Sequence, residues 1–88
     1  MSDPSVSTVT VRYYAAARTA AGTAEEHVRL VAGASVAELV DLVGSGRPEL
    51  ARVLLRCSFL HDEVVVRDPG DQLRAGSVLD VLPPFAGG

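Results

Sequence analysis

The last residues of the sequence are the ones whose types and spacing could do chemistry. Gly87 and Gly88 close the chain, and the terminal carboxylate of Gly88 follows a segment that has no Cβ atoms. Glycine has a small cross-section and adopts backbone angles closed to other residues, so such an end could pass through a narrow channel. A carboxylate is a poor electrophile and must be activated, for instance as an acyl adenylate, before it accepts a sulfur nucleophile. The pattern indicates a protein whose working group is its own C-terminus; the alternative is a frayed, unused end.

Two prolines mark the point where this end leaves the folded body. Pro83 and Pro84 cannot continue a strand, because proline has no N–H and forces the residue before it into an extended conformation. From Pro83 to Gly88 the chain extends at most about 20 Å, which is long enough to enter a pocket on another protein. The sequence therefore divides into a flexible N-terminus at 1–7, a folded domain at 8–82 and an extended tail at 83–88.

Few other residues are candidates for chemistry. Cys57 is the only cysteine, and it opens an apolar run in which a thiol behaves as a small hydrophobe. Neither His27 nor His61 has a carboxylate or a cysteine at ligand spacing, so no metal site is expected. The adjacent pairs Glu25-Glu26 and Asp62-Glu63 would point to opposite faces of a strand, which favours solvated charge over a shared acid–base site. We therefore expect no internal catalytic centre.

Composition restricts the class of protein further. The 88 residues are 48% hydrophobic and 22% charged, as in a single globular domain with one core. No apolar run approaches the roughly 20 residues that span a bilayer, and the start lacks a secretory signal, so we expect a cytoplasmic protein without membrane contact. The net charge is −3 and the eight basic residues are scattered arginines, which does not fit nucleic-acid binding. Without lysine, the chain has no side-chain amine to capture an activated carboxyl group.

The elements that must position the tail follow from hydrophobic spacing. Alternation predicts strands from Thr8 to Tyr14 and from Glu25 to Val31, with further strands at 57–60, 64–66 and 78–82. Ser35 and Glu38 form a capping box that starts the main helix. A short helix or helical turn is expected at 15–21, and a further helical segment starts at Pro48.

These elements predict an α+β fold with about five strands in a mixed sheet, packed on one main helix plus a short second helix. If the last strand lies beside the first in the centre of the sheet, the tail leaves from a rigid platform. Asp80 is the exception in an otherwise apolar last strand, and the sequence offers no account of it.

Two segments together resemble a known family. The run from Val11 to Arg18 reads VRYYAAAR, and the run from Leu79 to Gly88 reads LDVLPPFAGG. With the length of the chain, they are similar to the small, sulfur-carrying subunit of molybdopterin synthase, in the ubiquitin-like MoaD/ThiS family of sulfur carriers. The resemblance covers about Thr8 to Gly88 and is much more specific than two terminal glycines.

The resemblance implies a ubiquitin-like β-grasp fold for residues 8–82. It implies that an E1-like adenylyltransferase uses ATP to adenylate Gly88, which then becomes a thiocarboxylate and gives its sulfur to a cyclic pyranopterin monophosphate precursor of molybdopterin. The chain would not be an enzyme on its own and would need no cofactor; it would form a heterotetramer with the large synthase subunit. The residues implied to bind the partner through the tail are Pro83, Pro84, Phe85, Ala86 and Gly87.

The sequence departs from the family at one turn and leaves other functions open. Around Asp62-Glu63, relatives more often have an asparagine-glycine type turn. A carrier for thiamine or cysteine synthesis would share the fold and the glycines, although those relatives generally lack the Tyr13-Tyr14-Ala15 opening. A ubiquitin-like protein modifier joined to target lysines through Gly88 is a third hypothesis, and a binding module with an idle tail is the fourth.

Overall fold

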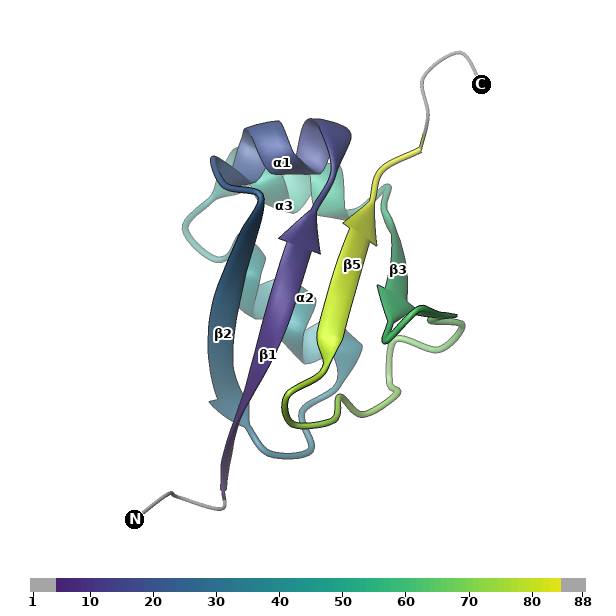
Figure 1. Cartoon of the computed structure of the whole chain (residues 1–88). Helices are drawn as coiled ribbons and strands as arrows, with labels where there is room; N and C mark the ends of the chain where they lie inside the picture. Colours follow the sequence, from purple (N-terminus) through teal and green to yellow (C-terminus); the bar gives the residue numbers. More distant parts are fainter. Residues whose placement is uncertain (1–4, 85–88) are drawn as a thin grey trace.

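A mixed five-stranded sheet organises the chain, and the computed structural model describes residues 5–84 of it (Figure 1). The strands are β1 (Val6–Tyr13), β2 (Glu25–Val31), β3 (Ser58–His61), β4 (Val64–Val65) and β5 (Val78–Leu82), in the order β2-β1-β5-β3-β4. The helices in this part of the chain are α1 (Ala15–Ala21), α2 (Val36–Gly44) and α3 (Pro48–Leu54). None of them is long and apolar enough to cross a membrane.

The last strand lies beside the first in the centre of the sheet, which is the arrangement that would let the tail leave from a rigid platform. β5 runs parallel to β1, with Thr10 opposite Val78 and Tyr13 opposite Val81, and it runs antiparallel to β3 on its other side. β5 therefore has a strand on both edges. The tail leaves from the middle of the sheet, at the end where β1 and β5 both finish (Figure 1).

The core lies between one face of the sheet and the helices. α2 crosses behind the sheet in Figure 1, while α1 and α3 lie near the end where the tail leaves. Alternate residues of β1 point into this core because side chains alternate between the two faces of a strand. The buried residues of the cluster are Val9, Val11, Tyr13, Ala17, Val36, Leu39, Val43, Leu50, Leu54, Leu73, Leu79 and Val81.

The capping box at the start of α2 is confirmed. The Ser35 hydroxyl accepts a hydrogen bond from the Glu38 backbone N–H at 3.1 Å, and the Glu38 carboxylate accepts one from the Ser35 backbone N–H at 3.4 Å. Two backbone donors at the helix N-terminus are satisfied in this way.

Three details differ from the sequence prediction. β1 begins at Val6, inside the segment expected to be a flexible N-terminus, because Val6 pairs with Val31 at the far end of β2. The described chain has three helices, one more than the fold-level expectation of a main helix and a short second helix, because the segments expected at 15–21 and after Pro48 both form helices. β4 is Val64–Val65, one residue shorter than the expected 64–66, although the Val66 backbone N–H still donates to the Phe59 carbonyl oxygen at 2.9 Å.

Candidate functional site

The root of the tail is held on both sides by backbone contacts. The Tyr14 backbone N–H donates to the Val81 carbonyl oxygen at 3.3 Å, and Leu82 lies opposite Ser58 of β3. Pro83 is half-buried and Pro84 is exposed. The other predicted site residues, Phe85, Ala86, Gly87 and Gly88, lie outside the described residues. The structure thus fixes where the tail starts, at the end of a central strand.

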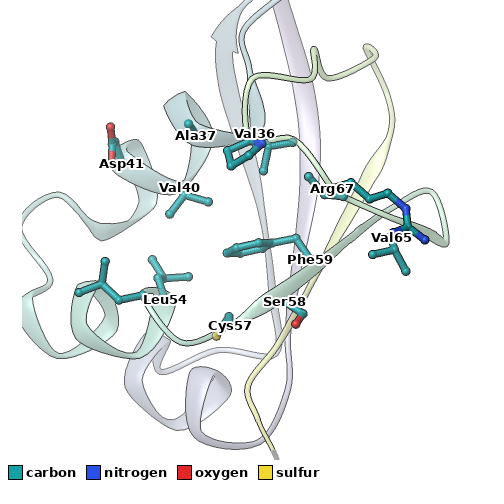
Figure 2. Close-up of a pocket in the computed structure, with 13 residues that line it drawn as sticks. Val36, Ala37, Val40, Asp41, Leu54, Cys57, Ser58, Phe59, Val65 and Arg67 are labelled. Atoms are coloured by element: carbon teal, nitrogen blue, oxygen red, sulfur yellow. The ribbon is translucent and has the colours of Figure 1, made fainter.

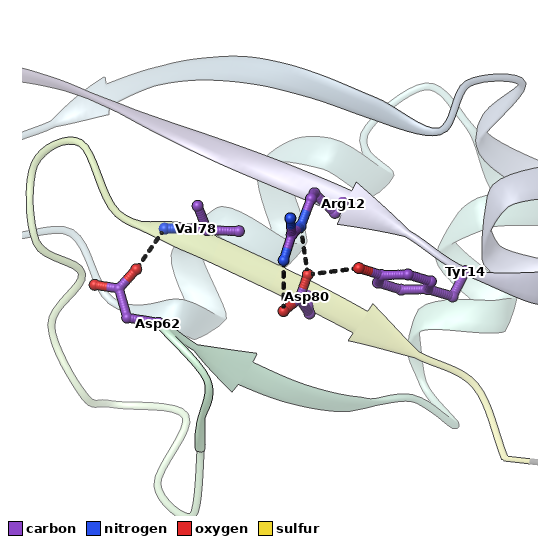
Figure 3. Close-up of polar contacts among 5 residues, drawn as sticks. All are labelled: Arg12, Tyr14, Asp62, Val78 and Asp80. Carbon is purple, nitrogen blue, oxygen red and sulfur yellow. Dashed lines mark hydrogen bonds and ion pairs between the residues drawn. The ribbon is translucent and has the colours of Figure 1, made fainter.

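A polar cluster sits on the open face of the sheet, next to this root (Figure 3). The Asp80 side chain is only 7% exposed and accepts from Arg12 through Nε at 2.8 Å and Nη2 at 3.4 Å. The Tyr14 hydroxyl donates to the same carboxylate at 3.1 Å. Asp80, which the sequence alone does not explain, is paired in the structure with two residues at the end of the neighbouring strand, Arg12 and Tyr14.

The electrostatics of the cluster follow from that carboxylate. The hydrogen bond to Asp80 and its negative charge raise the pKa of the Arg12 guanidinium, which stays cationic. Partial desolvation and then the hydrogen bond to Asp80 raise the pKa of the Tyr14 hydroxyl, which stays protonated and donates. The cluster therefore ties β1 to β5 at the position from which the tail departs.

The turn at Asp62-Glu63 is tied to the start of β5. Asp62 Oδ1 accepts from the Val78 backbone N–H at 2.9 Å, and Oδ2 accepts from Arg74 at 2.6 Å (Figure 3 shows the bond to Val78). These two hydrogen bonds, the backbone one first, lower the pKa of the Asp62 carboxyl. Asp62 thus holds the start of β5, and Asp80 binds Arg12 and Tyr14 at the middle of the strand.

Glu26 is a structural carboxylate. It accepts from the Tyr13 hydroxyl at 2.7 Å and from Arg47 at 2.9 Å, and its side chain is 24% exposed. The prediction of solvated charge is therefore wrong for Glu26. Strand alternation could have predicted that Glu26 is partly buried, because it lies on the same face of β2 as Val28 and Leu30, which pack against the core. The expectation that Glu25 and Glu26 do not share a site agrees with these contacts.

Cys57 is a half-buried thiol. Its Sγ donates to the Val53 carbonyl oxygen at 3.2 Å, and burial raises its pKa. His27 Nδ1 lies 3.0 Å from the Thr10 hydroxyl. Within residues 5–84, no group of three or more His, Cys, Asp and Glu side chains is arranged to hold a metal ion.

An apolar groove of about 420 Å³ opens on the helical side of the sheet (Figure 2). Phe59 forms its floor, Val36 and Val40 of α2 form one wall, and Leu54 and Cys57 form another. The groove begins beside Ser58, the residue opposite Leu82. It therefore borders the root of the tail.

The mixed sheet wrapped over α2, with its last strand central and the tail leaving from it, defines a ubiquitin-like protein of the β-grasp fold. The model of the ThiS family matches residues 11–88. The chain belongs to the ThiS family.

Three known proteins illustrate the likeness. The molybdopterin synthase sulfur carrier subunit of Chlamydomonas reinhardtii is 31% identical over 81 residues, which cover 91% of this chain and 98% of that protein. The small archaeal modifier protein SAMP1 of Haloferax volcanii is 22% identical, with 92% and 99% of the two chains covered and a TM-score of 0.81. A chain in the complex of subunits 1 and 2 of the molybdopterin-converting factor from Helicobacter pylori is 23% identical, with 92% and 99% covered and a TM-score of 0.64.

Proposed function

We propose that this protein is the sulfur carrier of molybdopterin synthesis and works in the cytoplasm. The observation that carries the proposal is the 31% identity to a molybdopterin synthase sulfur carrier subunit along nearly the full length of both chains. In the proposal, the tail, with two glycines after Phe85 and Ala86, supplies the reactive group, the carboxylate of Gly88.

The proposed chemistry takes place at the Gly88 carboxylate. An E1-like adenylyltransferase transfers AMP from ATP to the carboxylate and releases pyrophosphate. Sulfur at the oxidation level of sulfide, such as hydrosulfide from the sulfur donor, attacks the Gly88 carbonyl carbon and displaces AMP, which leaves a thiocarboxylate. That sulfur passes to a cyclic pyranopterin monophosphate within the large synthase subunit, and the carboxylate is regenerated. ATP belongs to the activating partner, and the carrier holds no cofactor.

The described residues support this proposal at the base of the tail. A reactive group delivered to a partner needs a fixed starting point, and β5 has a strand on each side and a buried carboxylate on its open face. Pro83 and Pro84 then direct the chain away from the sheet, because neither can continue its ladder. In the proposed complex, the tail is anchored by Pro83, Pro84 and Phe85, and Ala86 and Gly87 pass into the large subunit. Two carriers and two large subunits form a heterotetramer.

Side chains that could consume the activated carboxyl group are scarce or protected. The chain contains no lysine. Its single thiol, Cys57, donates a hydrogen bond to the Val53 carbonyl oxygen, and burial raises its pKa, which lowers the fraction of thiolate, the nucleophilic form. Capture of an acyl adenylate on Gly88 by an amine or a thiolate of the same chain is therefore disfavoured.

The experiment that tests the proposal is intact mass measurement. The protein is treated with its activating enzyme, ATP and a sulfur source, and we expect a product in which sulfur replaces one oxygen. A variant that lacks Gly88 is the matched control and should stay unmodified. Persistent failure of the native chain to gain sulfur with its own activating enzyme would refute the proposal.

Two alternatives share the same tail and differ in phenotype. Loss of molybdoenzyme activity on deletion, without a requirement for thiamine or cysteine, separates the proposed pathway from the other sulfur carriers. A protein modifier, the function named for the structurally similar SAMP1, would leave a Gly-Gly remnant on target lysines, on adducts that resist thiol reagents.

A further inference from the structure

The apolar groove on the helical side has no part in the sulfur chemistry described above. Figure 2 shows the Phe59 ring directed between Val40 and Leu54, with Cys57 and Ser58 at one end and Arg67 near Val65 away from them. Val40, Cys57 and Phe59 are only partly buried, so the groove presents apolar surface to solvent. Covering this surface with an apolar side chain would be favourable, because it removes apolar area from water.

The root of the tail lies at the end of this groove. Leu82 pairs with Ser58, and neighbouring strands are about 4.8 Å apart, so the next residue, Pro83, starts beside Cys57. Pro83 and Pro84 have no N–H and cannot extend the sheet, which leaves side chains as the means of holding the tail to the body. Phe85 is the first residue after them and the only aromatic residue in the tail.

We propose that Phe85 packs into this groove in the free carrier. Phe85 lies three residue steps beyond Leu82, a span of at most about 10 Å, which suffices to reach the near end of the groove, lined by Leu54 and Cys57. The ring would lie against Phe59 and cover the exposed apolar surface. The occupant is thus a segment of the same chain.

The position of a charged residue, Arg67, supports a tail that runs along the groove from the Cys57 end toward Arg67. The Arg67 side chain lines the groove, is exposed, and forms no ion pair with any residue between 5 and 84. From Phe85 to Gly88 the chain extends about another 10 Å. The Gly88 carboxylate, the one anion that the tail carries, would then reach the end of the groove lined by Arg67, whose guanidinium lies beside Val65 (Figure 2). A partner would bind only the undocked tail, so its apparent affinity would be the intrinsic affinity multiplied by the fraction of carrier molecules in which the tail is undocked.

The test uses nuclear magnetic resonance on the full chain. We expect nuclear Overhauser effects (NOEs) between the Phe85 ring and the methyl groups of Val40 and Leu54, independent of protein concentration. Ala37→Leu should abolish them, because Ala37 is an exposed residue of α2 that lines the groove and leucine would fill it. Ala16→Leu, at an exposed position of α1 outside the groove, should leave them intact.

Each result decides the proposal. Absence of these NOEs in the native chain overturns it, and so does a signal that grows with concentration, which would place Phe85 of a second copy in the groove. Persistence of the NOEs in Ala37→Leu also overturns the assignment to this groove. Phe85→Ala should shift the Val40 and Leu54 methyl resonances and leave Val9, in the core, unchanged. The sulfur proposal is judged separately by mass, so either proposal can fail while the other stands.

Discussion

Asp80 is a carboxylate in the central strand of a sheet, and its partners explain how the fold accepts it. A buried charge is costly unless it is paired and hydrogen-bonded, and Asp80 has both a guanidinium and a hydroxyl within reach. Arg12 itself is 42% exposed, so water screens part of the attraction. The arrangement fixes Arg12 and Tyr14 on the open face beside the tail.

Substitutions of Asp80 and its partners test how the Arg12–Asp80 ion pair affects the stability of the fold. Asp80→Leu should lower the melting temperature, because it leaves the Arg12 and Tyr14 donors without their acceptor. The triple variant Arg12→Met, Tyr14→Phe, Asp80→Leu should recover most of that loss, since replacing an ion pair by apolar side chains is often neutral or stabilising. Thermal unfolding followed by circular dichroism measures both. Equal destabilisation in the single and triple variants would contradict this account.

Cys57 gives a second prediction at the level of one side chain. Burial raises its pKa and the thiol donates to Val53, so alkylation by iodoacetamide near neutral pH should be slower than that of a free thiol such as glutathione. The rate should rise toward the free value when the protein is unfolded in denaturant. A folded-state rate equal to that of glutathione would show that the thiol is not protected.

Among the elements, the β3–β4 hairpin has the most demanding backbone. Asp62 and Glu63 both have positive φ, at 47° and 70°, and together they connect two antiparallel strands. Two-residue hairpin loops of this kind favour asparagine or aspartate followed by glycine. Asp62 fits and also binds Val78, whereas Glu63 occupies the position that glycine prefers.

Glu63→Gly should therefore stabilise the protein. Relief of the left-handed conformation outweighs the entropy that glycine adds to the unfolded chain, and we expect a gain of about 0.5 to 1 kcal/mol in the free energy of unfolding. Denaturant titration measures this gain. Glu63→Ala is the matched control, because it removes the same charge and keeps a Cβ; an equal gain in both variants would assign the effect to charge instead of backbone.

The elements were predicted from sequence where the signal was local. The alternation of β1 and β2 and the capping box of α2 depend on residues within a few positions, and their bounds were close to those observed. The contacts of Asp80 were not predictable in this way, because Arg12 lies 68 positions away and pairing requires β5 to be placed beside β1 in a known register. The groove beside the tail root likewise requires the packing of α2 against β3, which no local pattern specifies.

For the molecule as a whole, two paired carboxylates connect stability to pH. Arg47 and Tyr13 hold the pKa of Glu26 below its usual 4.5, with the Arg47 hydrogen bond as the largest cause and burial opposing it. The hydrogen bonds of Val78 and Arg74 hold the pKa of Asp62 below its usual 3.8. The first pair joins β1, β2 and the segment between α2 and α3; the second joins the β3–β4 hairpin to β5.

The direction of the pH effect follows from these lowered values. Both carboxyl groups bind protons more readily in the unfolded chain, so their contribution to stability is fully present above the unfolded pKa values and is lost as pH falls through the folded ones. We expect the free energy of unfolding to decrease as pH falls below about 4.5, the ordinary pKa of a glutamate such as Glu26.

Glu26→Gln should be less stable than the native chain at neutral pH and should lose less stability on acidification, because the glutamine side chain does not titrate. Glu49→Gln, at an exposed position of α3, is the control and should follow the native curve. Urea titrations at a series of pH values measure all three proteins, and parallel native and Glu26→Gln curves would show that the ion pair with Arg47 does not contribute to acid sensitivity.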